Sequence, residues 1–197
     1  MKLFYAHTSP YSRKVRLLLL EKGLKIEEQL CNPFDDTEEL KAANPLGKIP
    51  TLIIDDGTAL YDSRVICEYL DSLDAKIRLI PELDMPRWHV RRWEALADGI
   101  LDAAYNIVME RRRSSSEQSP QAVVNWQASI STALDHVNGD LNNLPLSISL
   151  AQLALGVSLG YLDFRLPELY WRNGRERLAE WYVNFENRAS MMSTRPK

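Results

Sequence analysis

Three short segments in the first third of the chain carry groups that could bind and activate a small ligand. In the first, Ser9 and Pro10 form a turn between a strand-like run and a helix-like run. A hydroxyl beside the unpaired N–H groups of a helix N-terminus favours an anion or a thiolate. A plain helix cap has the same sequence, so this segment alone leaves both roles open.

The other two segments bring a proline and an acid-hydroxyl pair. Pro50 stands directly before an apolar strand-like run, where it removes an amide donor. A cis bond before it would turn the preceding backbone toward a ligand, and the sequence leaves the isomer open. Asp62 and Ser63 stand at the predicted start of a helix, where capping and ligand binding are equally good interpretations.

Alternating strand-like and helix-like runs surround these segments. The predicted elements are a strand at 2–6, a helix ending at 22, a weak strand at 25–30, a short helix at about 36–43, strands at 51–55 and 58–61, and a helix from 63. Gly23 is a plausible glycine after the first helix, and Asp56-Gly57 between apolar runs predicts an antiparallel hairpin. The first half is therefore predicted as βαβαββα.

Beyond residue 86 the periodicity predicts one helix after another, and this change indicates a second domain with a seam near 79–81. Apolar stripes predict helices that include 93–108, 120–139 and 178–189. The run 148–164 is apolar all round, so we expect it to be enclosed by its neighbours. Ser149 and Gln152 stand in capping-box register at its start.

On this frame the three segments, in this order, resemble serine-type bacterial members of the glutathione S-transferase superfamily. The resemblance covers nearly the whole chain, including Ser149 and the C-terminal stretch from Glu186 to Pro196. It implies an α/β plus all-α fold: a thioredoxin-like βαβαββα domain over 1–78 that binds glutathione, followed by a helical-bundle domain over 86–197. The second domain is expected to contribute the electrophile pocket.

The same resemblance implies which residues hold the tripeptide. Lys48, Ile49 and Pro50 are expected to line it, with Ile49 exchanging backbone hydrogen bonds with the cysteinyl part before a cis Pro50. Asp62 and Ser63 are expected to hold the γ-glutamyl ammonium and carboxylate.

Ser9 is implied to be the catalytic hydroxyl that activates the glutathione thiol. Tyr5, inside the first strand, and Tyr11, on the first helical turn, are alternative hydroxyls. Tyr11, Tyr105 and Met109 are predicted to line the electrophile pocket, although such side chains on a long helix are also typical of a core. A serine cannot form the mixed disulfide of cysteine-type members, so we do not expect disulfide reduction.

Three departures from the family pattern matter. Gln152 stands where an aspartate is usual, although glutamine still completes a capping box. Asp62 stands before Ser63 where glutamate is commoner, and the stretch 34–37 lacks the basic or amide residue that often contacts the glycine carboxylate of glutathione, so modest affinity is expected.

Composition limits the partners. The 197 residues are 45% hydrophobic and 26% charged with a net charge of −3, which disfavours disorder and non-specific nucleic-acid binding. No run is long enough to span a membrane and no apolar leader opens the chain, so a cytoplasmic location is expected. Cys31 and Cys67 lack ligand spacing, so neither a metal nor a disulfide is expected.

The function expected from these arguments is an enzyme that uses glutathione as co-substrate to attack a small hydrophobic electrophile, acting as a homodimer. The alternative is a glutathione-binding or protein-interaction module of the same fold, as in stringent-starvation-type regulators. The run Arg111 to Arg113 could be a basic ligand patch, but a solvated helix end is the favoured interpretation.

Overall fold

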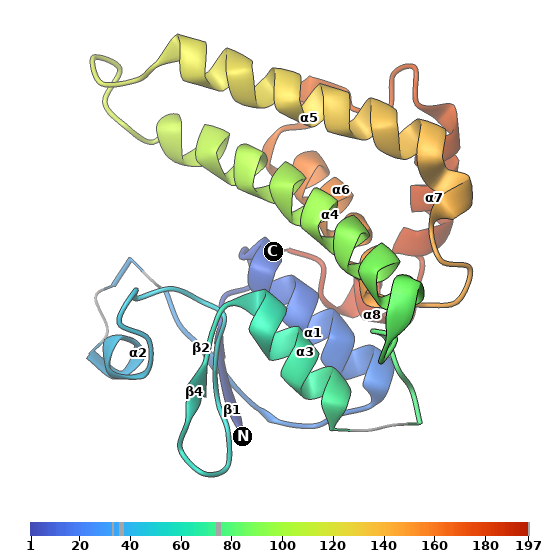
Figure 1. Cartoon of the computed structure of the whole chain (residues 1–197). Helices are drawn as coiled ribbons and strands as arrows, with labels where there is room; N and C mark the ends of the chain where they lie inside the picture. The colour runs from blue at the N-terminus through green and yellow to red at the C-terminus, as the bar shows by residue number, and fades with distance from the viewer. Residues whose placement is uncertain (33, 36–37, 74–75, 197) are drawn as a thin grey trace. The chain divides into compact units, whose positions relative to one another are not determined.

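The computed structural model describes residues 1–32, 34, 35, 38–73 and 76–196, and these divide into two compact units (Figure 1). Unit 1 consists of Met1–Pro81 and Ala189–Lys197, and unit 2 consists of Glu82–Arg188. The C-terminal residues, which the sequence analysis assigns to the helical domain, are thus grouped with the first unit.

Unit 1 is a small mixed sheet with helices, in the predicted βαβαββα order. Its elements are β1 (Lys2–Tyr5), α1 (Pro10–Lys22), β2 (Glu27–Leu30), α2 (Glu38–Ala43), β3 (Thr51–Ile53), β4 (Ala59–Leu60), α3 (Ser63–Ser72) and the C-terminal α8 (Ala189–Ser193). The strands lie in the order β2-β1-β3-β4, with β1 parallel to β2 and the other pairs antiparallel. Residues 36 and 37, the predicted start of the short helix, lie outside the described residues.

The hairpin between β3 and β4 forms where the sequence predicts it. Gly57 has a φ of 89°, a conformation that a side chain would disfavour, and the Ile54 N–H donates to the Thr58 carbonyl at 2.9 Å. Asp56 Oδ1 accepts from the Thr58 N–H at 2.8 Å, which holds the pKa of this carboxyl below its usual range.

Helices α1 and α3 pack against each other within unit 1 (Figure 1). Leucine and isoleucine side chains from both helices and from the sheet have no exposed surface, among them Leu3, Leu17, Leu18, Leu52, Ile66 and Leu70. The short α8 packs on α1 through buried Arg13, which donates to the Met191 carbonyl at 3.0 Å and to Thr194 Oγ1 at 3.3 Å. These contacts explain why the end of the chain belongs to unit 1.

Unit 2 is all-helical. It contains α4 (Asp84–Glu110), α5 (Pro120–Asp140), α6 (Leu150–Arg165) and α7 (Glu176–Glu186), with short 3-10 turns at Leu141–Asn143 and Pro167–Leu169. Residues 150–162 of α6 are all buried, as its all-round apolar pattern predicts, and α4 packs along it. The predicted last helix, drawn through residue 189, is instead two helices, because α7 ends at Glu186 and α8 starts at Ala189. None of the described helices is long and apolar enough to cross a bilayer.

Gln152 ties the start of α6 to the preceding loop. Its Oε1 accepts from the Ser149 N–H at 2.8 Å, and its Nε2 donates to the Pro145 carbonyl at 2.8 Å. Both bonds are largely shielded from water, so Gln152→Ala is expected to lower the free energy of unfolding by about 1–3 kcal/mol, measured by urea titration. Gln121→Ala, at an exposed position of α5, is the control, and equal effects of the two substitutions would contradict the role given to Gln152.

Candidate functional site

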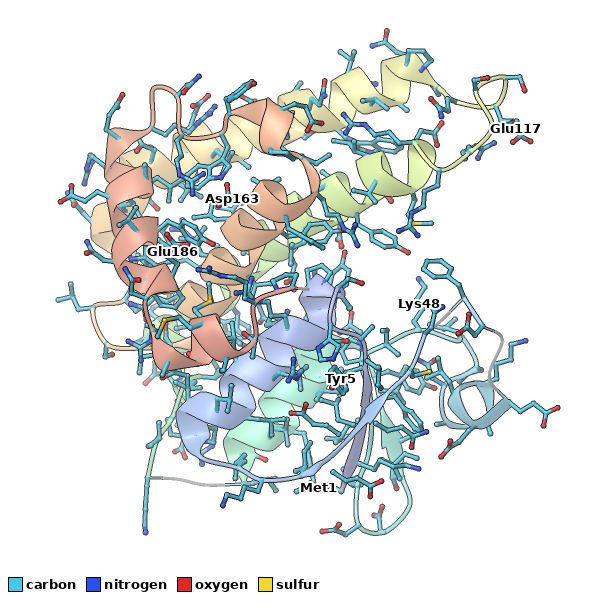
Figure 2. The ribbon with its side chains drawn as sticks, turned by 180° about the vertical axis from the view of Figure 1, so that it is seen from behind. Met1, Tyr5, Lys48, Glu117, Asp163 and Glu186 are labelled. Carbon is cyan, nitrogen blue, oxygen red and sulfur yellow. The ribbon has the colours of Figure 1, made fainter. Side chains whose placement is uncertain are left out.

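The strand directions of unit 1 bring the three predicted segments to one edge of its sheet. Because β3 is antiparallel to both β1 and β4, β1 and β4 end at the same edge where β3 begins. Ser9 follows β1, Pro50 precedes β3, and Asp62 follows β4. All three segments therefore lie at the edge away from Met1, and Figure 2 shows Lys48 toward the Tyr5 end of β1.

Ser9 is the N-cap of α1. Its Oγ accepts from the Ser12 N–H at 3.2 Å, and its carbonyl accepts from the Arg13 N–H at 3.0 Å. A hydroxyl that accepts one hydrogen bond still has its own proton to donate. The half-buried Ser9 hydroxyl can thus cap the helix and, at the same time, donate a hydrogen bond to an anion. The first turn of α1 carries no acidic residue that would repel such an anion.

Ile49 presents backbone groups that the fold leaves unused. The peptide bond between Ile49 and Pro50 is cis, and neither the N–H nor the C=O of Ile49 has a hydrogen-bond partner among the described residues. An extended ligand backbone can pair with such a donor and acceptor as a strand pairs with a sheet edge. The side chain of Lys48 is exposed beside it.

Buried Asn44 and Thr51 brace this loop, a role that the sequence analysis missed. Asn44 Nδ2 donates to the Lys48 carbonyl at 3.0 Å and to Thr51 Oγ1 at 3.1 Å, while its Oδ1 accepts from the Leu46 N–H at 3.0 Å. Thr51 Oγ1 also donates to the Lys48 carbonyl at 2.8 Å. These bonds fix the backbone on both sides of Ile49. A polar pair flanking a Pro-Gly loop is the only sequence signal of this brace.

Asp62 and Ser63 begin α3. Asp62 is exposed, and its Oδ1 accepts from the Arg64 N–H at 2.9 Å as an N-cap. One carboxylate oxygen therefore caps the helix. The carboxylate also places a negative charge at the same sheet edge. Ser63 is buried in the first turn. The Tyr61–Asp62 peptide bond is also cis, which nothing in the sequence predicted.

The remaining predicted residues fall in different places. Tyr5 is 8% exposed, with the guanidinium carbon of Arg16 4.5 Å from its ring centre, so its ring packs within unit 1. Tyr11 is half-buried on the first turn of α1. Tyr105 and Met109 lie on α4 in unit 2. Of the stretch 34–37, residues 36 and 37 lie outside the described residues.

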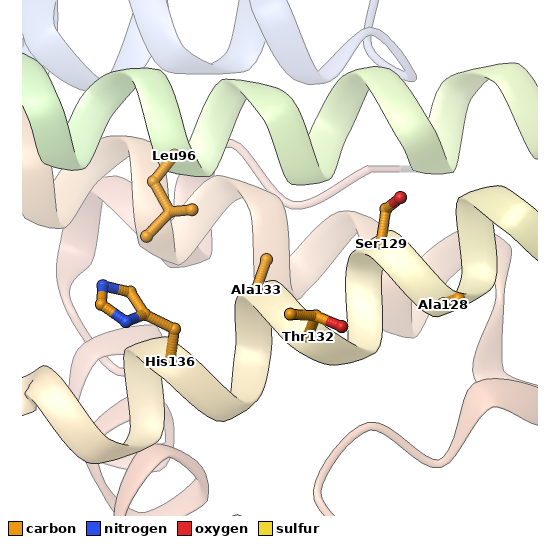
Figure 3. Close-up of a pocket in the computed structure, with 6 residues that line it drawn as sticks. All are labelled: Leu96, Ala128, Ser129, Thr132, Ala133 and His136. Atoms are coloured by element: carbon orange, nitrogen blue, oxygen red, sulfur yellow. The ribbon is translucent and has the colours of Figure 1, made fainter.

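Unit 2 has a shallow groove of about 630 Å³ between α4 and α5. Figure 3 shows Leu96 of α4 facing a row of mostly small side chains on α5, with the His136 ring beside them. The other lining residues are Ala128, Ser129, Thr132 and Ala133. Neither Tyr105 nor Met109 lines this groove, and within the described ranges no group of three His, Cys, Asp or Glu side chains could hold a metal ion.

Comparison with known proteins decides the family. Residues 3–77 match the family described as glutathione S-transferase, N-terminal domain. The uncharacterized GST-like protein YibF of Escherichia coli K12 is 34% identical over 199 residues, covering 100% of this chain and 98% of that protein. The chain belongs to the glutathione S-transferase family.

Solved structures of the family agree with this assignment. A glutathione transferase family member from Pseudomonas fluorescens Pf-5, with bound glutathione, has a TM-score of 0.96 and 38% identity, covering 100% of this chain and 98% of that one. A structure of a family member from the same strain, with bound S-(propanoic acid)-glutathione, has a TM-score of 0.92 and 37% identity, covering both chains fully at 100%. The chain thus shares its fold with relatives whose structures hold glutathione or a glutathione thioether.

Proposed function

We propose that this glutathione S-transferase binds glutathione at the sheet edge of unit 1 and transfers it to a small electrophile. The proposal rests mainly on the backbone N–H and C=O of Ile49, which have no partner among the described residues and can pair with the cysteinyl part of the tripeptide. Ser9 and Asp62 follow strands that end at the same edge. The glutathione-bound relatives support the choice of ligand.

Ser9 is assigned the activation of the thiol. A free thiol with a pKa of about 8.5 is only about 3% ionised at pH 7, and lowering that pKa by about two units makes most of it thiolate. The shift requires about 2.7 kcal/mol of preferential stabilisation of the charged form. A hydroxyl donor to a charged sulfur supplies about 1.5–3 kcal/mol and the helix N-terminus about 0.3–1 kcal/mol, so together they suffice.

The thiolate then attacks the electrophile. A carbon–sulfur bond forms, and either a leaving group departs with its electron pair or an activated double bond takes up a proton from solvent.

Tyr11, Tyr105 and Met109 remain the residues proposed to line the electrophile pocket. A homodimer and a cytoplasmic location are proposals that rest on family membership, and analytical ultracentrifugation tests the first.

In this proposal Asp62 binds the γ-glutamyl ammonium of glutathione. Ser63 lies beside the γ-glutamyl carboxylate, and Lys48 lies beside the tripeptide. Asp62→Asn is expected to weaken glutathione binding about tenfold, because asparagine caps a helix as aspartate does but lacks the charge. The pKa of the bound thiol should not change, since Ser9 remains. Calorimetric titration with glutathione measures the first effect, and ultraviolet absorbance of the thiolate measures the second.

The matched control is Asp55→Asn. Asp55 pairs with the N-terminal ammonium of Met1 at 2.6 Å, at the other edge of the sheet. The substitution therefore removes the same charge at a position away from the candidate site. If the two variants bind glutathione equally well, Asp62 does not hold the ammonium.

A further inference from the structure

The peptide group between Lys48 and Ile49 is held by buried side chains on one side and has an unused donor on the other. Its carbonyl oxygen, on Lys48, accepts from Asn44 Nδ2 at 3.0 Å and from Thr51 Oγ1 at 2.8 Å. Its N–H, on Ile49, has no partner among the described residues. A carbonyl oxygen has two lone pairs, so the two donors use its full capacity.

The planarity of this peptide group links the direction of its N–H to that of its carbonyl. The bond between Lys48 and Ile49 is trans. In a planar trans peptide the C=O and the N–H point in opposite directions. Because the carbonyl faces the Asn44 and Thr51 side chains, the N–H of Ile49 points away from them. Rotation of the peptide plane would reverse both groups and break both hydrogen bonds.

Asn44 is itself fixed, because each of its polar groups has a partner. Its N–H donates to the Leu40 carbonyl of α2 at 2.7 Å, and its carbonyl accepts from the Gly47 N–H at 2.8 Å. Its Oδ1 accepts from the Leu46 N–H at 3.0 Å, which leaves Nδ2 to donate. Asn44 is 1% exposed and Thr51 is 0% exposed. Away from water a hydrogen bond is stronger and an unpaired polar group costs more, so rotation of the peptide plane is unfavourable.

The loop around this peptide group is anchored in the core of unit 1. Thr51 is the first residue of β3 and lies opposite Phe4 of β1. The Ile49 side chain packs against a buried cluster that includes Phe4. The core therefore fixes where the loop lies, and the Asn44 and Thr51 side chains fix the direction of its peptide plane.

We propose that Asn44 and Thr51 are positioning residues for glutathione, because they keep the Ile49 N–H directed toward the tripeptide. The inference rests on the proposed function and deepens it. Neither side chain binds the ligand, and both act through the Lys48 carbonyl. A rotated peptide would present this oxygen to the cysteinyl carbonyl of glutathione, and two acceptors cannot form a hydrogen bond. Binding would weaken, whereas the pKa of the bound thiol would stay the same because Ser9 remains.

Calorimetric titration of the full-length protein with glutathione measures the expected loss of affinity. Asn44→Ala removes the three hydrogen bonds of the side chain and should weaken binding about tenfold. Thr51→Val keeps the shape of the side chain but lacks the hydroxyl, and it should weaken binding about three- to tenfold. Thr51→Ser keeps the hydroxyl and should bind glutathione within about twofold of the wild-type affinity.

Hydrogen exchange of the Ile49 amide, followed by nuclear magnetic resonance, reports the pairing of this N–H directly. Saturating glutathione should slow this exchange about tenfold or more in the wild-type protein and in Thr51→Ser. In Asn44→Ala and Thr51→Val it should slow the exchange less than about threefold. The pKa of the bound thiol, measured by ultraviolet absorbance, should be the same in all four proteins. Thermal unfolding shows that each protein is folded at the temperature of the measurement, so lost stability alone would not produce this pattern.

Asn138→Ala is the control, because Asn138 Oδ1 accepts from the Leu178 N–H at 3.0 Å and so holds backbone in unit 2. It should change neither the affinity nor the exchange of the Ile49 amide. Wild-type affinity and wild-type protection in folded Asn44→Ala and Thr51→Val would overturn the positioning role and leave the proposed function standing. Glutathione binding that leaves the Ile49 amide of the wild-type protein unprotected would also overturn it. If glutathione does not bind the wild-type protein, the proposed function fails and this inference fails with it.

Discussion

Ser9→Ala is expected to lower kcat/KM toward a neutral aryl chloride about 25-fold at pH 7. Without the Ser9 hydroxyl, the pKa of the glutathione thiol should return from about 6.5 to about 8.5, and the thiolate fraction at pH 7 then falls about 25-fold. The affinity for glutathione should change little, because Ile49, Asp62 and Ser63 remain. Steady-state kinetics at saturating glutathione, repeated at several pH values, measures the effect, which should shrink as the pH approaches 9.

Ser9→Ala removes both the N-cap of α1 and the hydrogen-bond donor to the thiolate, so these two effects have to be separated. Ser119 provides the control, because it also precedes a proline at a helix start and its Oγ accepts from the Ala122 N–H at 3.3 Å. Ser9→Ala and Ser119→Ala should each lower the free energy of unfolding by about 1 kcal/mol. Only the first should alter the pH profile. A pH profile that stays the same in Ser9→Ala would remove Ser9 from catalysis and direct attention to Tyr11.

Asp71→Asn is expected to lower the free energy of unfolding by about 3–5 kcal/mol. Lys22 Nζ lies 3.0 Å from Asp71 Oδ1, and the two side chains are 0% and 3% exposed. Asp71 also accepts from the Leu79 N–H at 2.9 Å and from the Ile80 N–H at 3.0 Å. The substitution leaves the lysine charge buried beside a neutral amide, and urea titration measures the loss.

The exposed pair of Arg16 and Glu28 is the control for Asp71. It joins α1 to β2 at 2.8 Å, with side chains 16% and 33% exposed. Because solvent screens this pair, Glu28→Gln should change stability by less than about 1 kcal/mol. Similar small losses in both variants would contradict the structural role given to the buried pair.

The sequence predicted those parts of the fold that depend on local chemistry. Asp56-Gly57 specified the hairpin, the apolar stripe over 120–139 specified α5, and the all-round apolar run specified the buried α6. It did not predict the break after Glu186, because neither glycine nor proline marks it. The separate α8 depends instead on Arg13, a residue distant in sequence whose contacts exist only in the folded unit.

The candidate site could be predicted where short motifs carry it. Ser9, Pro50 and Asp62 each stand beside a strand end, so their order on a βαβαββα frame was enough to group them. Asn44 could not be found in this way. It acts through the Lys48 carbonyl, and this contact exists only in the folded unit.

The pKa of the glutathione thiol bound to the wild-type protein is the most direct test of thiol activation at the N-terminus of α1. Ultraviolet absorbance of the thiolate, followed from about pH 5 to pH 9 at saturating glutathione, gives this value. The bound thiol is expected to ionise about two pH units below the thiol of free glutathione, and this shift should disappear in Ser9→Ala. A bound thiol that titrates as it does in free glutathione would contradict an activating site at the N-terminus of α1.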